Sequence, residues 1–208
     1  MKKLTFLPVA ILLSASAITT TLSAQSSTAT TAETKTKTAP ADKNSTTKEE
    51  FFMDRFYAAK AAYPALSSVV WGHYAASTYT KEKFIERYNQ IKAAYPKLTE
   101  VFGDYAGSEY ALEDFAKRYY EIKDTYLDLT KYYGDYAASK KTLPEFAKRY
   151  YQIKDSAPDL SEVYGQYAAS DNELTEFLTR YNGIKASNTG MKNCYGEYAG
   201  STKKLSSK

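Results

Sequence analysis

The sequence predicts an all-α protein, an α-solenoid of stacked αα-hairpin repeats. Two observations predict this fold class. Five glycines recur every 31 residues, and each opens the same phrase, Gly-x-Tyr-Ala-(Ala/Gly)-Ser. Within each copy the apolar residues recur every three or four positions, which is the helical period rather than the strand period. The glycines are Gly72, Gly103, Gly134, Gly165 and Gly196.

The rest of the repeat keeps the same register. Four further columns of the repeat hold Phe, Arg, Tyr and Ile without slipping, beginning at Phe84, Arg87, Tyr88 and Ile91. A partial copy at 52–64 precedes the first complete one. The series therefore begins with the second half of a repeat and ends with a first half, near Ser201.

The first 24 residues have the three parts of a bacterial-type secretory signal peptide. Lys2 and Lys3 supply the charged start, a mostly apolar stretch follows to Leu13, and small residues come after it. Cleavage after Ala24 and cleavage after Ala17 are both compatible with the small residues present. No segment approaches the roughly 18 apolar residues that a membrane span needs. The sequence thus predicts export to the periplasm or the medium, with no membrane span.

Residues 25–48 are rich in Ser, Thr and Lys and hold no aromatic residue, so they predict a disordered tether. Residues 49–200 form the predicted helical repeat domain, and residues 201–208 a basic flexible tail. The whole chain has a formal charge of +4, but residues 49–200 hold 19 Lys and Arg against 22 Asp and Glu. A folded domain with this balance is unlike a nucleic-acid reader, which gathers basic residues on its folded surface.

The copies around residue 150 show why each repeat should be two helices. Leu143, Phe146, Tyr150 and Ile153 make an apolar stripe behind Thr142, whose pairing with a glutamate three residues later predicts a capping box. We expect a second helix to follow this one. The apolar stripe of the second helix runs from Leu160 through Val163, Tyr164 and Tyr167 to Ala168, with Ser156 as its cap and Pro158 in its first turn.

Helices of three to four turns are marginal alone in water, so each hairpin must be stabilised by its neighbours. Stacking in a line would give about ten short helices in total. The recurring glycine costs about 1 kcal/mol per copy relative to Ala. We expect it to allow close helix approach, with room for aromatic rings of the adjacent repeat; a bend in the helix is the alternative.

The spacing is similar to that of tetratricopeptide-type arrays, in which a glycine of the first helix is followed by a small residue and then an aromatic one in the second. Here Gly165 is followed by Phe177 and Tyr181. The bulky Phe177 and the period of 31 rather than about 34 residues depart from that pattern, so the similarity concerns architecture only.

A stack of copies offers the same surface several times, which suits binding or scaffolding better than catalysis. The chain has one histidine, His73, and one cysteine, Cys194. We expect His73 to be a polar surface residue and Cys194 to be a small buried one, since Cys194 shares its column with Val70, Val101, Tyr132 and Val163. No catalytic set, metal site or cofactor site is predicted.

The 21 tyrosines divide into core and surface groups. The columns of Tyr105 and Tyr119 lie on the apolar stripes and should be buried. Tyr120 and Tyr151 lie about 100° further round the helix and should be exposed, with Asn89 and Asn182 in the same column. These four residues are the candidate ligand surface.

The arginine column completes the set of candidate ligand residues. A spaced row of cations could meet an anionic polysaccharide, while pairing with the acidic column of Asp104, Asp135 and Glu197 is the structural alternative. The arginines are Arg87, Arg118, Arg149 and Arg180.

Together these features predict an exported helical-repeat protein that binds another macromolecule, a protein or a polysaccharide, at the cell surface or in the periplasm. The alternative is a self-associating structural protein of the envelope or extracellular space. An enzyme would require one asymmetric pocket with a perturbed carboxylate.

Overall fold

The structure is a computed structural model that describes residues 50–206, all within one compact unit, Ser45–Lys208. The predicted signal peptide and tether lie outside the described residues. The described part of the chain is all-helical, with α-helices and short 3₁₀ helices and no strand. None of its helices is both long enough and apolar enough to cross a lipid bilayer.

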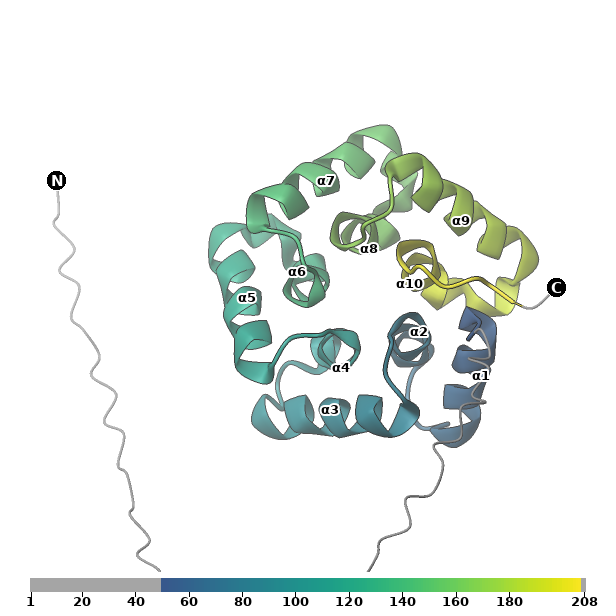
Figure 1. The fold of residues 1–208 in the computed structure, drawn as a ribbon. Coiled ribbons are helices and arrows are strands. Elements are labelled where there is room, and N and C mark those ends of the chain that lie inside the picture. Colours follow the sequence, from purple (N-terminus) through teal and green to yellow (C-terminus); the bar gives the residue numbers. More distant parts are fainter. Residues whose placement is uncertain (1–49, 207–208) are drawn as a thin grey trace, which may run out of the picture. The chain divides into compact units, whose positions relative to one another are not determined.

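Five helices form an outer layer and five shorter ones an inner layer, in strict alternation along the chain (Figure 1). The outer helices are α1 (Phe52–Ala62), α3 (Lys81–Ala94), α5 (Leu112–Thr125), α7 (Leu143–Ser156) and α9 (Leu174–Ser187). The inner helices are α2 (Ser68–Ala76), α4 (Phe102–Gly107), α6 (Tyr133–Ala138), α8 (Tyr164–Ala169) and α10 (Tyr195–Gly200). Each outer helix packs against the inner helix that follows it, so the unit of structure is a helical hairpin.

The outer helix α7 begins as the sequence predicts. Its capping box is present: the backbone N–H of Thr142 donates to the Glu145 carboxylate over 2.9 Å, and the Thr142 side chain caps the first turn. The helix ends at Ser156, because Ala157 leaves helical geometry at φ −144° and ψ 66°. The prediction that Ser156 caps the following helix is therefore wrong; it is the last residue of α7.

The inner helices are shorter than predicted. The stripe from Leu160 to Ala168 is not one α-helix, because Leu160 has φ −105° and ψ 35° and the segment up to Val163 is 3₁₀ helix. The α-helical part starts only at Tyr164. A 3₁₀ segment precedes each of the four shortest inner helices, whereas α2 begins directly as an α-helix. The four segments are η1 (Thr99–Val101), η2 (Leu127–Tyr132), η3 (Pro158–Val163) and η4 (Thr189–Cys194).

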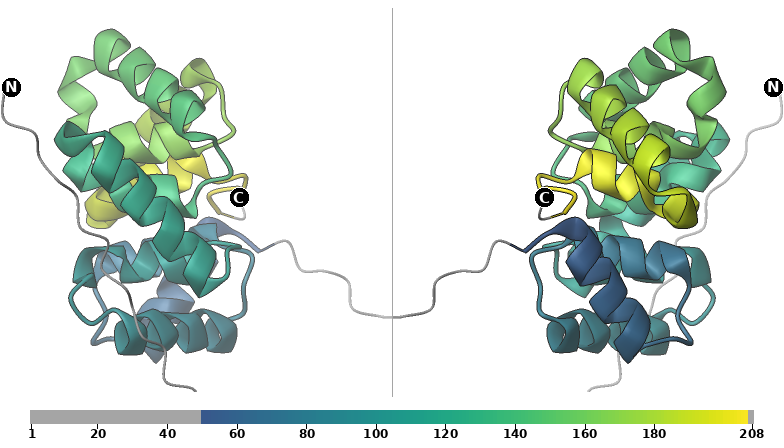
Figure 2. Two further views of the ribbon diagram at one scale, coloured as in Figure 1. Left: turned by 90° about the vertical axis from the view of Figure 1, so that its left-hand side faces the viewer. Right: turned by 90° about the vertical axis from the view of Figure 1, so that its right-hand side faces the viewer.

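The hairpins do not stack in an open line but close into a ring. The last inner helix, α10, packs against the first, α2 (Figure 1), and the right-hand view of Figure 2 shows dark-blue α1 next to the yellow-green end of the ring. The two ends of the described part of the chain are also joined by backbone hydrogen bonds, from the Phe52 N–H to the Lys204 carbonyl over 2.9 Å and from the Met53 N–H to the Leu205 carbonyl over 3.0 Å. The open array that the sequence predicts is thus replaced by a closed one.

The aromatic contact that closes the ring is the same kind of contact that joins consecutive hairpins elsewhere in the ring. Between consecutive hairpins, a tyrosine of the inner helix meets the first phenylalanine of the next outer helix edge to face. The Tyr198–Phe52 pair at the closure has a centroid distance of 5.4 Å, the same as for Tyr136–Phe146. The other pairs are Tyr74–Phe84, Tyr105–Phe115 and Tyr167–Phe177.

Residues 201–205, predicted as part of a flexible tail, belong to the fold. Ser201 is buried and Leu205 packs against the core. Leu205 lies 31 residues after Leu174, so it holds the position that begins the other leucine-led outer helices. The end of the chain therefore supplies the start of α1, and the repeat is complete only once the ring is closed.

The predicted core tyrosines are buried, except Tyr88, which is partly buried against the core. Tyr105, Tyr136 and Tyr167 are at most 1% exposed, and Tyr119 is 5% exposed. Cys194 is also fully buried, as predicted, and its Sγ donates to the Ser68 carbonyl across the closure. Burial raises the pKa of this thiol.

Candidate functional site

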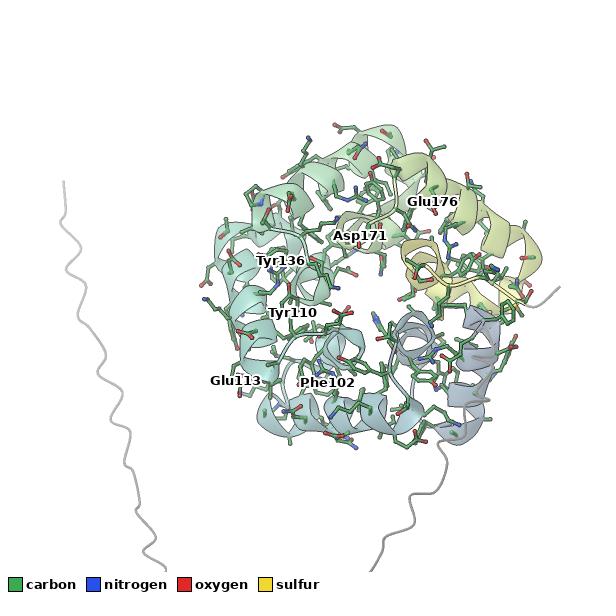
Figure 3. All side chains as sticks on the ribbon, in the orientation of Figure 1. Phe102, Tyr110, Glu113, Tyr136, Asp171 and Glu176 are labelled. Atoms are coloured by element: carbon green, nitrogen blue, oxygen red, sulfur yellow. The ribbon has the colours of Figure 1, made fainter. Side chains whose placement is uncertain are left out.

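The residue after each repeat glycine faces the centre of the ring. These five side chains, here called the axial ring, come one from each inner helix and line a cavity of about 230 Å³. Figure 3 shows polar side chains pointing into the space between the inner helices, while Glu113 of α5 lies on the outer side. The axial ring consists of His73, Asp104, Asp135, Gln166 and Glu197.

His73 lies between two carboxylates of the axial ring. Its Nε2 is 3.7 Å from Asp104 Oδ1 and 4.0 Å from Glu197 Oε1, distances too long for hydrogen bonds but close enough for ionic attraction. All three side chains are shielded from solvent, with 15%, 11% and 5% exposed for His73, Asp104 and Glu197. One imidazole thus faces two carboxylates in a poorly hydrated place.

The environment of the axial ring favours protonated carboxyls. Burial raises the pKa values of Asp104 and Glu197, although the nearby His73 opposes both shifts. Burial, together with the Asp104 and Glu197 carboxyls, raises the pKa of Asp135 well above its usual range. Asp135 is therefore the carboxyl of the ring that most resists ionisation.

The wall beside the axial ring is made of small residues. They lie three positions further along each inner helix, on the same helix face. This small-residue wall consists of Ala76, Gly107, Ala138, Ala169 and Gly200. A second groove, of about 880 Å³, reaches the axial ring near Gln166 and Glu197, and Lys185, Lys192 and Tyr195 are among its lining residues.

The repeat glycine makes room for the axial ring. A methyl group at Gly134 would overlap the Asp104 carboxylate, and one at Gly165 would overlap the Asp135 carboxylate. Aromatic rings, which we expect from the sequence to fill this space, approach at two of the repeat glycines: Tyr132 Cδ1 lies 2.8 Å from a methyl at Gly165, and the His73 imidazole would overlap one at Gly103. The glycine therefore mainly leaves room for the side chain of the polar axial residue in the preceding repeat.

The arginine column is engaged with the backbone rather than free in solvent. Arg87 donates to the carbonyls of Tyr105 and Tyr110 over 2.9 and 2.7 Å, and its guanidinium lies 4.2 Å from the Tyr105 ring centre. Equivalent bonds from Arg118, Arg149 and Arg180 hold the ends of α6, α8 and α10. Arg87 is 8% exposed. The four candidates thus act as caps of the inner helices, and the predicted row of exposed cations is not formed.

The acidic column does not pair with these arginines either. Asp104, Asp135 and Glu197 lie at the axis, whereas the guanidiniums lie between the layers, on helix carbonyls. His73, predicted as a surface residue, shares the axis with them. Among the described residues, no set of three or more His, Cys, Asp or Glu side chains is spaced to hold a metal ion.

The other four candidates are exposed, as predicted, and they lie on four of the outer helices. Tyr120 and Tyr151 are 42% and 40% exposed, and Asn89 and Asn182 are also exposed. The structure adds Tyr57 of α1, which is 49% exposed and occupies the same column of the repeat. One such residue thus lies on each outer helix. The outer belt consists of Tyr57, Asn89, Tyr120, Tyr151 and Asn182.

The axial ring had a signal in the sequence. Its position is occupied by five polar residues of four different types, directly after an unchanging glycine and directly before an unchanging tyrosine. In an open line these residues would lie on separate copies, and only closure brings them to one point.

Comparison with protein-family models, with curated proteins and with solved structures finds no match to this chain.

Proposed function

We propose that this protein is an exported, ring-shaped binding protein that contacts a protein or a polysaccharide through its outer belt. The observation that supports this most directly is that its tyrosines divide into a buried group and an exposed group. Most are buried in the repeat, yet Tyr57, Tyr120 and Tyr151 stand 40–49% exposed at equivalent positions of three outer helices. Exposed tyrosine and asparagine offer flat apolar area and hydrogen bonds at low entropic cost, which is the chemistry of recognition surfaces.

Lysines enlarge the belt surface. Lys123 Nζ lies 5.6 Å from the ring centre of Tyr120, and Lys154 Nζ lies 5.7 Å from that of Tyr151. Each pair presents an aromatic face with a cation beside it. This combination fits a partner with both apolar and anionic groups, such as an acidic polysaccharide or a protein surface.

Self-association as a structural protein is the second candidate. Closure of the ring pairs the two terminal half-repeats with each other, which removes the free ends that end-to-end growth would use. Association would have to occur side by side through the outer belt. Sedimentation over a wide concentration range distinguishes this function, because side-by-side association predicts larger species at high concentration.

The test compares the full chain with a double variant, Tyr120→Ala with Tyr151→Ala, on glycan arrays and in pull-downs from envelope and extracellular fractions. The matched control is Lys117→Ala with Lys148→Ala, which alters exposed residues of the same two helices outside the belt. We expect the belt variant to lose the ligand and the control to keep it. Absence of any ligand for the unaltered chain, or equal binding by the belt variant, would reject the proposal.

Folding must be unchanged for that comparison to hold. Because both tyrosines are exposed, the belt variant should unfold within about 0.5 kcal/mol of the unaltered chain. Phe146→Ala removes a side chain with 0% exposure and should cost about 3–5 kcal/mol.

A further inference from the structure

The axial cavity holds a buried hydrogen-bond acceptor that lacks a donor. The side-chain oxygen of Gln166 is fully buried and accepts no hydrogen bond. The Glu197 side chain is 95% buried; its own backbone N–H supplies a hydrogen bond, and the His73 imidazole lies 4.0 Å away, beyond hydrogen-bond distance. Leaving a buried oxygen such as that of Gln166 unpaired is costly, so it requires an explanation.

The other side chains that line the cavity do not supply the missing donor. The serine hydroxyls that line it are already used, since each donates to the carbonyl of the tyrosine three residues earlier, as Ser139 does to Tyr136 over 2.9 Å. Among the described residues that line the cavity, only His73 can carry a positive charge, against three carboxyls. The unmet requirement is for a cation with several N–H donors.

The cavity also has room and an apolar side. Liquid water occupies about 30 Å³ per molecule, so 230 Å³ corresponds to roughly seven or eight waters, or to a small organic molecule. The small-residue wall lies one helical turn from the axial ring and offers mostly methyl groups and Cα atoms. This combination suits a ligand with a charged head and a short alkyl part better than a bare ion.

We propose that the axial cavity binds a primary alkylammonium ion. Its ammonium group, with three N–H donors, lies among the carboxylates and the Gln166 oxygen, and its alkyl part lies against the small-residue wall. The site is separate from the outer belt. It is built by closure of the ring, since each hairpin contributes one side chain.

The single histidine of the chain makes the test direct, because its imidazole proton signal reports only on the axial cavity. The full chain in phosphate buffer is titrated with n-propylammonium chloride and followed by the NMR signal of His73. Sodium chloride controls for ionic strength, and tetramethylammonium chloride controls for a cation without N–H donors. We expect a saturable shift with n-propylammonium and none with the two controls.

Variants identify the acceptors. At about pH 8, Asp135→Asn should weaken n-propylammonium binding by at least about ten-fold, because the ammonium loses a carboxylate whose ionisation its own charge favours. Asp124→Asn, an exposed carboxylate on α5, should leave binding unchanged. Gln166→Met keeps the side-chain size and removes the unpaired oxygen, so this variant should fold and still bind several-fold more weakly.

Binding should also tighten between about pH 5 and about pH 8, because the ligand favours ionised carboxyls. The proposal is overturned if no saturable shift develops up to about 100 mM n-propylammonium. It is equally overturned if tetramethylammonium or sodium gives the same shift, or if Asp135→Asn and Gln166→Met both bind like the unaltered chain. None of these outcomes bears on the outer belt.

Discussion

At the scale of single residues, the repeat depends on two neighbouring positions, the repeat glycine and the axial residue after it. The first must lack a side chain, and the second can carry different polar side chains. The glycine must lack a side chain because the axial residue of the preceding hairpin occupies that space, as Asp135 does beside Gly165. The axial residue itself is free to vary in chemistry. This explains why the glycine recurs unchanged while the next position holds His, Asp, Gln and Glu.

Two glycine substitutions test this explanation. Gly165→Ala would place a methyl against the Asp135 carboxylate and Tyr132, so it should destabilise the fold by about 1–3 kcal/mol despite the better helix propensity of Ala. Gly183→Ala in α9 meets no atom within 4 Å and should stabilise by roughly 0.5–1 kcal/mol. Urea denaturation measures both. A stabilising Gly165→Ala would contradict the close approach.

Which side chains of a helix are buried and which are exposed was largely predictable from the sequence. The 100° step from Tyr119 to Tyr120 separates a side chain that is 5% exposed from one that is 42% exposed. Tyr57 was not singled out because it lies in the partial copy, outside the complete repeats, although its column is the same.

At the scale of elements, the inner helices are too short to persist alone. Apart from α2, each has six α-helical residues, so its stability comes from packing and from its ends. The arginine of the outer helix caps the C-terminal end of the inner helix by donating to its carbonyls. Arg118 donates to the carbonyls of Tyr136 and Lys141 over 3.0 and 2.7 Å and stacks 4.2 Å from the Tyr136 ring centre.

Arg118→Lys should therefore not behave as a conservative change. A lysine cannot reach both carbonyls with a planar group, nor stack in the same way, so we expect a loss of about 1–2 kcal/mol in unfolding free energy. Lys117→Ala, at an exposed position next to it, should change stability by less than about 0.5 kcal/mol. Equal effects in chemical denaturation would show that the guanidinium does not support α6.

At the scale of the whole ring, closure gathers ionisable groups that the sequence spaces 31 residues apart. The resulting burial raises the carboxyl pKa values of Asp104, Asp135 and Glu197. A carboxyl with a raised folded-state pKa binds more protons in the folded state than in the unfolded one. Stability from these groups is therefore greatest below the ordinary carboxyl pKa of about 4 and falls as pH rises through the raised values.

Asp135→Asn should remove the largest part of this pH dependence. In phosphate buffer we expect the variant to be about 1–2 kcal/mol more stable than the unaltered chain near pH 8 and nearly equal to it near pH 4. Thermal denaturation across this range measures the difference. Asp124→Asn should follow the unaltered chain at each pH. A variant that is less stable near pH 8 would show that the Asp135 carboxylate is a net stabilising group.

Closure itself can be tested by moving the chain ends. Because Leu205 and Phe52 occupy adjacent parts of one repeat, a short linker between them should be accepted, with new ends opened at the exposed Lys140 between α6 and α7. We expect this circular permutant of residues 50–208 to keep its helical circular-dichroism spectrum and a compact, ring-sized scattering profile. An unfolded or elongated permutant would contradict the closed ring.

The sequence by itself determined the helices, the period, the capping box at Thr142 and the burial of the tyrosine columns, because these depend on spacings of a few residues along one chain. Only the tertiary structure decided that the array closes, that Ser201–Leu205 complete α1, and that His73 faces Asp104 and Glu197. The physical reason is that closure depends on the small rotation between successive hairpins. That rotation is set by how side chains pack across each junction, and only the sum of all the junctions brings Phe52 to Tyr198.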